Sequence, residues 1–290
     1  MQSGLADDAF MRHVLACNNV DLPGPRAPFR IAGKTVGWVL PPLRAALARF
    51  PVIEDTGDGL TLREPGTLQA IARATSEQGL HRWRGEAFDV RAEPDGPVLA
   101  VLDRGGLPAF GVRSVGVHVN GLVRRPDGLH LWIGRRAAHK QLDPNKLDHL
   151  VAGGVSAGLT GRQTLLKEGE EEASLPRALG ERAVLVGRVA YVMERREGLR
   201  RDLLHCFDLH LPEDFRPVPQ DGEVAEFELW PIERVFQTVR DTDDFKFNVN
   251  LVLIDLFLRL GLIAEAQARA LRPALYRLDG RASETDSTNP

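Results

Sequence analysis

The sequence predicts a mixed α/β protein in two parts, a small α+β domain at residues 1–110 and a second domain at residues 111–275. Three observations support this prediction. Alternating apolar residues on both sides of the turn 126–128 indicate a β-hairpin, a capped helix begins near residue 160, and further strand and helix patterns follow it. The chain of 290 residues is long enough for each part to bury its own core.

The first part alternates helices with short strands. Helices are predicted at residues 3–17, 41–50 and 67–78, and strands at residues 29–31, 88–91 and 98–102. Pro41 and Thr67 suit the first turns of their helices, and Gly79 suits the position just after the last one. The histidines of this part are isolated, so we find no catalytic group in it and its role stays open.

The second part contains the longer elements. After the hairpin at 115–119 and 129–133, strands are predicted at 183–194, 202–211 and 225–230, and helices at 231–239, 247–260 and 263–270. This order of strands and helices is typical of a mixed α/β domain. Residues 276–290 are polar and rich in Ser and Thr, and we expect them to be disordered.

Composition narrows the class of protein. Lys and Arg number 37 against 40 for Asp and Glu, a near balance that argues against a nucleic-acid or membrane surface. The two cysteines make no disulfide framework, the N-terminus shows no apolar signal-peptide core, and the longest apolar run is too short to span a bilayer. We therefore expect a soluble cytoplasmic protein, and the sequence does not indicate an oligomeric state.

Three carboxylates stand close together in the capped helix. Glu168, Glu171 and Glu172 are spaced i, i+3 and i+4, which places them on one helix face about 5–6 Å apart at Cβ. Oxygen ligands at this density suit Mg²⁺ or Mn²⁺. The alternative is a solvated face rich in Glu. Thr160 and Gln163 have the spacing of a capping box, which predicts that the helix begins after Thr160.

Glycines frame the same stretch. Gly153, Gly154 and Gly158 allow a tight loop whose backbone can approach a ligand or a metal ion. Within the helix, Leu165, Gly169 and Ala173 form the stripe expected to face the sheet. Since glycine costs about 1 kcal/mol against alanine inside a helix, Gly169 indicates close packing there.

The stretch Gly153–Leu175 resembles the Nudix box, the loop–helix motif of the Nudix hydrolases, whose pattern is G-x5-E-x7-R-E-U-x-E-E-x-G-U with U an aliphatic residue. Aligned without gaps from Gly153, the sequence retains the three helix carboxylates. It departs from the pattern at Leu159 for Glu, Lys167 for Arg, Gly169 for the aliphatic residue and Ser174 for Gly. The resemblance implies an α/β/α sandwich with a mixed sheet, and we expect Lys167 to orient a carboxylate by ion pairing.

Longer runs narrow the resemblance. Residues 115–123, 132–154 and 167–176 are similar to the thiamine-pyrophosphokinase-related Nudix proteins, in which a small N-terminal domain precedes the Nudix domain. That group implies hydrolysis of thiamine diphosphate, or of its oxidised and damaged relatives, to the monophosphate. The substrate would be a small-molecule diphosphate. A Nudix fold that binds a nucleotide-like ligand without turnover, as a sensor, is the alternative.

Residue roles follow from the motif positions and their surroundings. The resemblance implies Glu168, Glu171 and Glu172 as metal ligands, with the Ala152 carbonyl as a further ligand. Glu168, Glu172 and the loop residue Glu223 are the candidate catalytic residues. Candidates for substrate binding are Arg135 and Lys140 for phosphate, and Asp148, Phe245 and Lys246 for the organic part. Phe245 and Phe247 could instead be core residues, and Glu223, Arg135 and Lys140 simply solvated.

Overall fold

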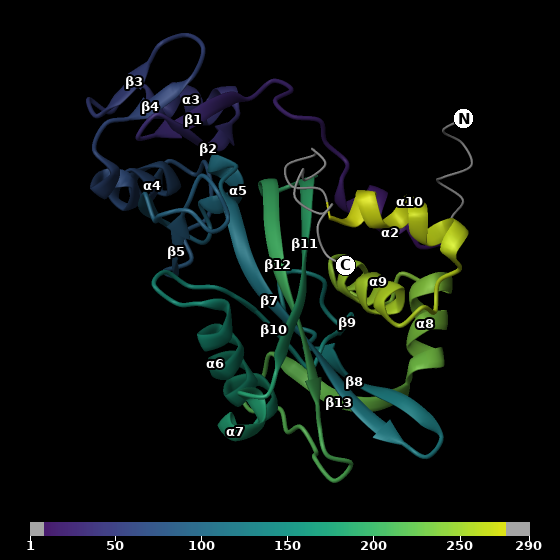
Figure 1. The fold of residues 1–290 in the computed structure, drawn as a ribbon. Helices are drawn as coiled ribbons and strands as arrows, with labels where there is room; N and C mark the ends of the chain where they lie inside the picture. Colours follow the sequence, from purple (N-terminus) through teal and green to yellow (C-terminus); the bar gives the residue numbers. More distant parts are fainter. Residues whose placement is uncertain (1–8, 277–290) are drawn as a thin grey trace.

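The computed structural model describes residues 9–276, and its largest element is a mixed seven-stranded sheet (Figure 1). Five strands run in the order β11-β12-β7-β8-β13, with β10 paired to β7 and β9 to β8. Strand β12 pairs with β7 in parallel, and the other pairs are antiparallel. Its strands are β7 (Arg113–Arg125), β8 (Gly128–Arg136), β9 (Leu147–Asp148), β10 (Val151–Gly154), β11 (Val184–Arg195), β12 (Gly198–His210) and β13 (Val224–Pro231).

Helices cover both faces of this sheet (Figure 1). On one face lie α6 (Gly161–Ala173) and α7 (Arg177–Gly180), and on the other α8 (Ile232–Asp241), α9 (Val249–Arg259) and α10 (Glu265–Leu275). Alternate residues of β7 supply the two cores: Val117 and Val119 pack toward α6, while Leu122 packs with the residues of α9. This is the α/β/α sandwich with a mixed sheet that the resemblance implies.

The N-terminal part has its own sheet and core. A four-stranded sheet runs in the order β2-β1-β4-β3, and a separate pair is formed by β5 and β6. Its elements are β1 (Ala27–Ile31), β2 (Lys34–Val39), α3 (Pro41–Leu47), β3 (Ile53–Asp55), β4 (Leu60–Leu62), η1 (Pro65–Thr67), α4 (Leu68–Glu77), β5 (Ala87–Val90), β6 (Ala100–Asp103) and α5 (Leu107–Phe110). The prediction missed β2, although it pairs with the expected strand β1.

The first helix does not belong to the N-terminal core. Helix α2 (Met11–Cys17) buries Met11, Val14 and Cys17 in the core of α9 and α10, and the Phe10 ring lies 5.1 Å from that of Phe236. The predicted helix at 3–17 is therefore shorter in its described part, and it packs on the second part of the chain because its apolar face has its partners there. Residues 1–8, and all of the expected disordered tail except residue 276, lie outside the described residues.

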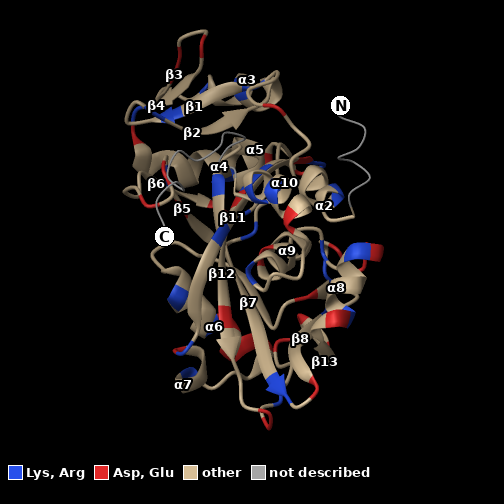
Figure 2. Ribbon diagram, turned by 45° about the vertical axis from the view of Figure 1, so that its right-hand side comes forward, with Lys and Arg blue, Asp and Glu red and all other residues tan. Residues whose placement is uncertain are grey.

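Charged residues of both signs are spread over the two parts (Figure 2). No helix among residues 9–276 is both long enough and apolar enough to cross a membrane.

Candidate active site

Helix α6 begins as predicted. The Thr160 hydroxyl oxygen accepts a hydrogen bond from the Gln163 backbone N–H at 3.2 Å, and the Gln163 side chain accepts one from the Thr160 N–H at 2.9 Å. Both halves of the capping box are therefore present. The predicted stripe of Leu165, Gly169 and Ala173 is buried against the sheet side. A Cβ at Gly169 would lie 3.0 Å from Leu175 Cδ2, which confirms the close packing expected there.

The three helix carboxylates differ in their surroundings. Glu172 is only 6% exposed, and its Oε2 accepts a hydrogen bond from the Ala152 N–H of β10 at 3.0 Å. Glu168 lies over Gly153, since a Cβ on that glycine would be 2.5 Å from Glu168 Cγ. Glu171 faces solvent, with 49% of its side chain exposed. Glu168 and Glu172 therefore both lie against β10, while Glu171 points away from it.

Lys167 bridges two of these carboxylates. Its Nζ lies 3.0 Å from Glu168 Oε1 and 2.7 Å from Glu171 Oε2, so the predicted ion pairing is confirmed. Both carboxylates are thereby held along the same edge of α6.

Burial makes Glu172 difficult to ionise without a cation. Desolvation raises the pKa of Glu172 to about 8, and desolvation also raises the pKa of Glu168. A nearby divalent cation stabilises the ionised form of a carboxyl group. The buried carboxyl groups of Glu168 and Glu172 are therefore suited to a site that holds a metal ion.

A loop far along the chain completes the carboxylate group. Ligand oxygens of Glu172, Asp221 and Glu223 all lie within 4.8 Å of one another. The structure thus brings Glu223, proposed from the sequence as a carboxylate from a later loop, beside Glu172. Asp221 was missed, and the Asp-Gly turn before β13 is the only local signal for it. With carboxylates as its side-chain ligands, the group suits Mg²⁺ or Mn²⁺.

The candidate phosphate residues already have partners. Lys140 forms an ion pair with Glu223. Burial by itself raises the pKa of Glu223, but the effect of Lys140 is opposite and the net pKa is lowered. Arg135 Nε donates to Glu226 at 2.8 Å and its Nη1 donates to the Asn145 carbonyl at 3.2 Å. Lys140 therefore lies at the carboxylate group, whereas Arg135 is held by β13.

The residues expected at the organic part of a substrate are more buried than predicted. Asp148 Oδ2 lies 2.9 Å from Arg136 Nη1 and 3.5 Å from Lys246 Nζ, so its charge is already balanced. Phe245 needs a correction: it is 2% exposed and meets the Trp230 ring edge-on at 6.4 Å, and it is therefore a core residue. Its β-bridge partner Leu147 is buried in the same core, so the two side chains point to the same side.

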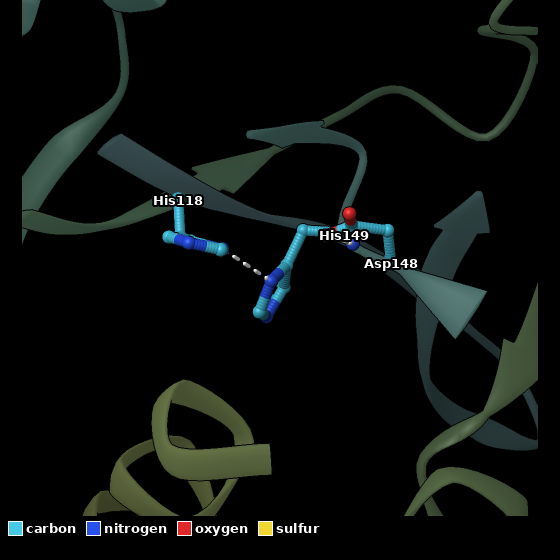
Figure 3. A group of neighbouring side chains, drawn as sticks. All are labelled: His118, Asp148 and His149. Carbon is cyan, nitrogen blue, oxygen red and sulfur yellow. Dashed lines mark hydrogen bonds between the residues drawn. The ribbon is translucent and has the colours of Figure 1, made fainter. Parts of the chain in front are cut away.

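A histidine pair beside Asp148 was also missed. His118 of β7 and His149 point toward each other, with 3.0 Å between their Nδ1 atoms (Figure 3). Burial lowers the pKa of both and that of His149 to about 4, so both rings are neutral. His118, Asp148 and His149 have a metal-like spacing, but Arg136 and Lys246 beside Asp148 disfavour a cation there. No spacing rule in the sequence connects residues 118 and 149.

One small cavity joins these groups. It has a volume of about 10 Å³, near the size of one water molecule, and lies between the carboxylates and Asp148. Its lining residues are Arg136, Asp148, His149, Ala152, Glu172, Glu223 and Val224.

A helix with clustered carboxylates, packed beside a glycine-rich strand in an α/β/α sandwich, defines a Nudix-type hydrolase domain. Comparison with known proteins agrees: residues 115–250 match the NUDIX domain, and residues 9–114 match a domain of unknown function, DUF4743. Nudix hydrolase 24, chloroplastic, from Arabidopsis thaliana is 44% identical over 267 residues, covering 88% of this chain and 73% of that protein. The chain belongs to the Nudix hydrolase family.

Other similar proteins match a smaller share of this chain. Nudix hydrolase 20, chloroplastic, from the same plant is 44% identical over 180 residues, and the match covers 62% of this chain but only 48% of that protein. Among solved structures, a protein from Deinococcus radiodurans is 22% identical with a TM-score of 0.44, covering 59% of this chain and 98% of that chain.

Proposed function

We propose that this protein is a Mg²⁺- or Mn²⁺-dependent pyrophosphohydrolase that cleaves a diphosphate linkage by attack of water on phosphorus. The observation that supports this function most directly is the carboxylate group of Glu172, Asp221 and Glu223, drawn from two distant segments to within 4.8 Å. Such a reaction depends mainly on charge stabilisation and positioning, which this group and the adjacent Lys140 can provide.

The proposed ligands are Glu168, Glu171, Glu172 and the Ala152 carbonyl. The Ala152 N–H donates to Glu172, and the C=O of a residue in an extended strand points to the same side as its N–H, so the Ala152 carbonyl also faces the carboxylates. A bound ion would neutralise phosphate oxygens and lower the pKa of a water molecule. Glu223 would accept the proton of the attacking water or serve as a further ligand.

We further propose thiamine diphosphate and its oxidised relatives as substrates. The carboxylates need only a diphosphate, so selection must come from groups that meet the organic part. Asp148 and His149 line the same small cavity as Glu223, and Lys246 Nζ lies 3.5 Å from Asp148 Oδ2, so a polar group of the substrate that reached this cavity could hydrogen-bond there. The proposal rests on this polarity together with the runs at 115–123, 132–154 and 167–176.

A substrate panel tests the function and the specificity together. With one metal ion throughout, we expect oxothiamine diphosphate and thiamine diphosphate to exceed ADP-ribose and a nucleoside triphosphate in kcat/KM by about tenfold or more, which equals about 1.4 kcal/mol of selectivity. The measurement is phosphate or monophosphate release. A tenfold preference for either nucleotide would reject the thiamine assignment, and no metal-dependent release from any diphosphate would reject the hydrolase.

Leu159 provides a test against the sensor alternative. This half-buried residue occupies the family's first Glu position in the loop before α6. We expect Leu159→Glu to change kcat by less than about tenfold, because the helix carboxylates already form the proposed ligand set. A hundredfold gain would instead show that the natural chain is impaired for turnover and would favour a ligand-binding role.

The predicted cytoplasmic location remains a proposal as well. The names of both plant relatives carry the word chloroplastic. Fractionation of cells that express the full chain would test it.

A further inference from the structure

Strand β5 of the N-terminal part lies against the loop that connects β10 to α6. This loop, residues 155–160, carries Leu159 and precedes the carboxylate helix. The loop ends at Thr160, the N-cap of the helix that carries Glu168 and Glu172.

Four successive residues of the N-terminal part contact this region. The Ser156 hydroxyl donates to Glu86 Oε1 at 2.8 Å, the Ala157 N–H donates to the Ala87 carbonyl at 2.7 Å, and the Gly158 N–H donates to Asp89 Oδ1 at 3.3 Å. Between them, the Phe88 ring covers Gly154, where a Cβ would be only 2.6 Å from Phe88 Cζ. We call residues Glu86–Asp89 the clamp.

The clamp is itself anchored. The buried Asp103 carboxylate accepts hydrogen bonds from the backbone N–H groups of Arg84, Gly85 and Glu86 at 2.9, 2.7 and 3.1 Å. A buried carboxylate held by several N–H groups fixes the backbone that surrounds it. Arg104 Nη1 then donates to Glu86 Oε2 at 2.8 Å, which leaves Oε1 directed at Ser156. Arg104 therefore helps to orient the Glu86 carboxylate toward Ser156.

We propose that the N-terminal domain helps to position the active site. Glu86, through its hydrogen bond with Ser156, holds in place the loop before α6. This is the loop that carries Leu159 where the family pattern has Glu. Glu86 is a positioning residue in this proposal and touches neither substrate nor metal. The proposal rests on the hydrolase function and assigns a role to the domain that precedes the Nudix domain.

The test compares Ser156→Ala, Glu86→Ala, Glu86→Gln and the double variant Ser156→Ala with Glu86→Ala in the full chain. We expect both alanine variants and the double variant to lower kcat by about tenfold to a similar extent, because residues that act as a unit are not additive. Glu86→Gln keeps one oxygen to accept from Arg104, and its amide N–H can donate to the Ser156 hydroxyl oxygen, so the contact is retained and kcat should stay within about twofold of wild type. Thr67→Ala and Glu77→Gln, which remove exposed contacts elsewhere in the same domain, are the matched controls.

A second readout separates this proposal from the hydrolase function. Amide hydrogen exchange at residues 154–160 should become faster in both alanine variants and stay unchanged in the controls, whether or not a substrate is known. Three outcomes would each overturn the proposed role of the clamp. The first is a loss of activity in step with melting temperature, and the second is an equal loss in Glu86→Gln and Glu86→Ala. The third is unchanged exchange and kcat in the alanine variants. A wild-type protein without diphosphate hydrolysis would reject only the function, and exchange would still decide the clamp.

Discussion

Glu172→Gln is expected to lower kcat by about 100-fold or more, which corresponds to about 2.7 kcal/mol of transition-state stabilisation. Glutamine fills the same space and retains an oxygen that can accept from the Ala152 N–H, but it cannot supply the ligand charge. The measurement is steady-state hydrolysis, made separately at saturating Mn²⁺ and at saturating Mg²⁺. Glu170→Gln, an exposed change on the opposite edge of α6, is the control. Activity within about tenfold of wild type would contradict the metal-site assignment.

The difference in stability between Glu172→Gln and wild type depends on pH in a defined direction. The alternative reading of a solvated Glu-rich face does not hold for Glu172, because its side chain is buried and its pKa is raised from 4.5 to about 8. Wild-type protein without metal therefore loses stability as pH rises from about 4.5 toward 8, since unfolding releases a proton. The variant lacks this loss, so with a chelator present its melting temperature at pH 8 should equal or exceed that of wild type.

Gly153→Ala is expected to lower kcat by about 30- to 100-fold with little change in melting temperature, since a displacement of about 1 Å in an active site can have this effect. The new Cβ would lie 2.5 Å from Glu168 Cγ, 2.7 Å from its Cδ and 3.0 Å from its Oε2. The Glu168 side chain is flexible and can move away, so the fold tolerates the methyl group while the carboxylate leaves its place over β10.

Kinetics and thermal melting of the same preparation check this expectation. Gly66→Ala is a suitable control, because a Cβ there meets nothing within 4 Å. A Gly153→Ala protein with normal kcat would show that Glu168 has no required position, and one that loses activity only in proportion to unfolded protein would point to a structural role.

Local chemistry accounts for what the sequence predicted. The start of α6 depends on Thr160 and Gln163 three residues apart, and the close packing at Gly169 depends on its neighbours in the same motif. Gly79 and Gly261 adopt the positive φ values of 76° and 69° that follow a helix end. The hairpin of β7 and β8 turns at a Pro-Asp-Gly signal. All of these features are set by residues near one another in the chain, so a single sequence reveals them.

The tertiary structure alone decided which of these residues share an environment. It buried Glu172 and left Glu171 exposed on the same helix, and it brought Asp221 and Glu223 to Glu172 across about fifty residues. It also placed α2 on the second core, made Phe245 a core residue, and set Glu86 against Ser156 seventy positions away. Burial and long-range contact depend on how the sheet and its helices pack, and no spacing along the chain encodes that packing.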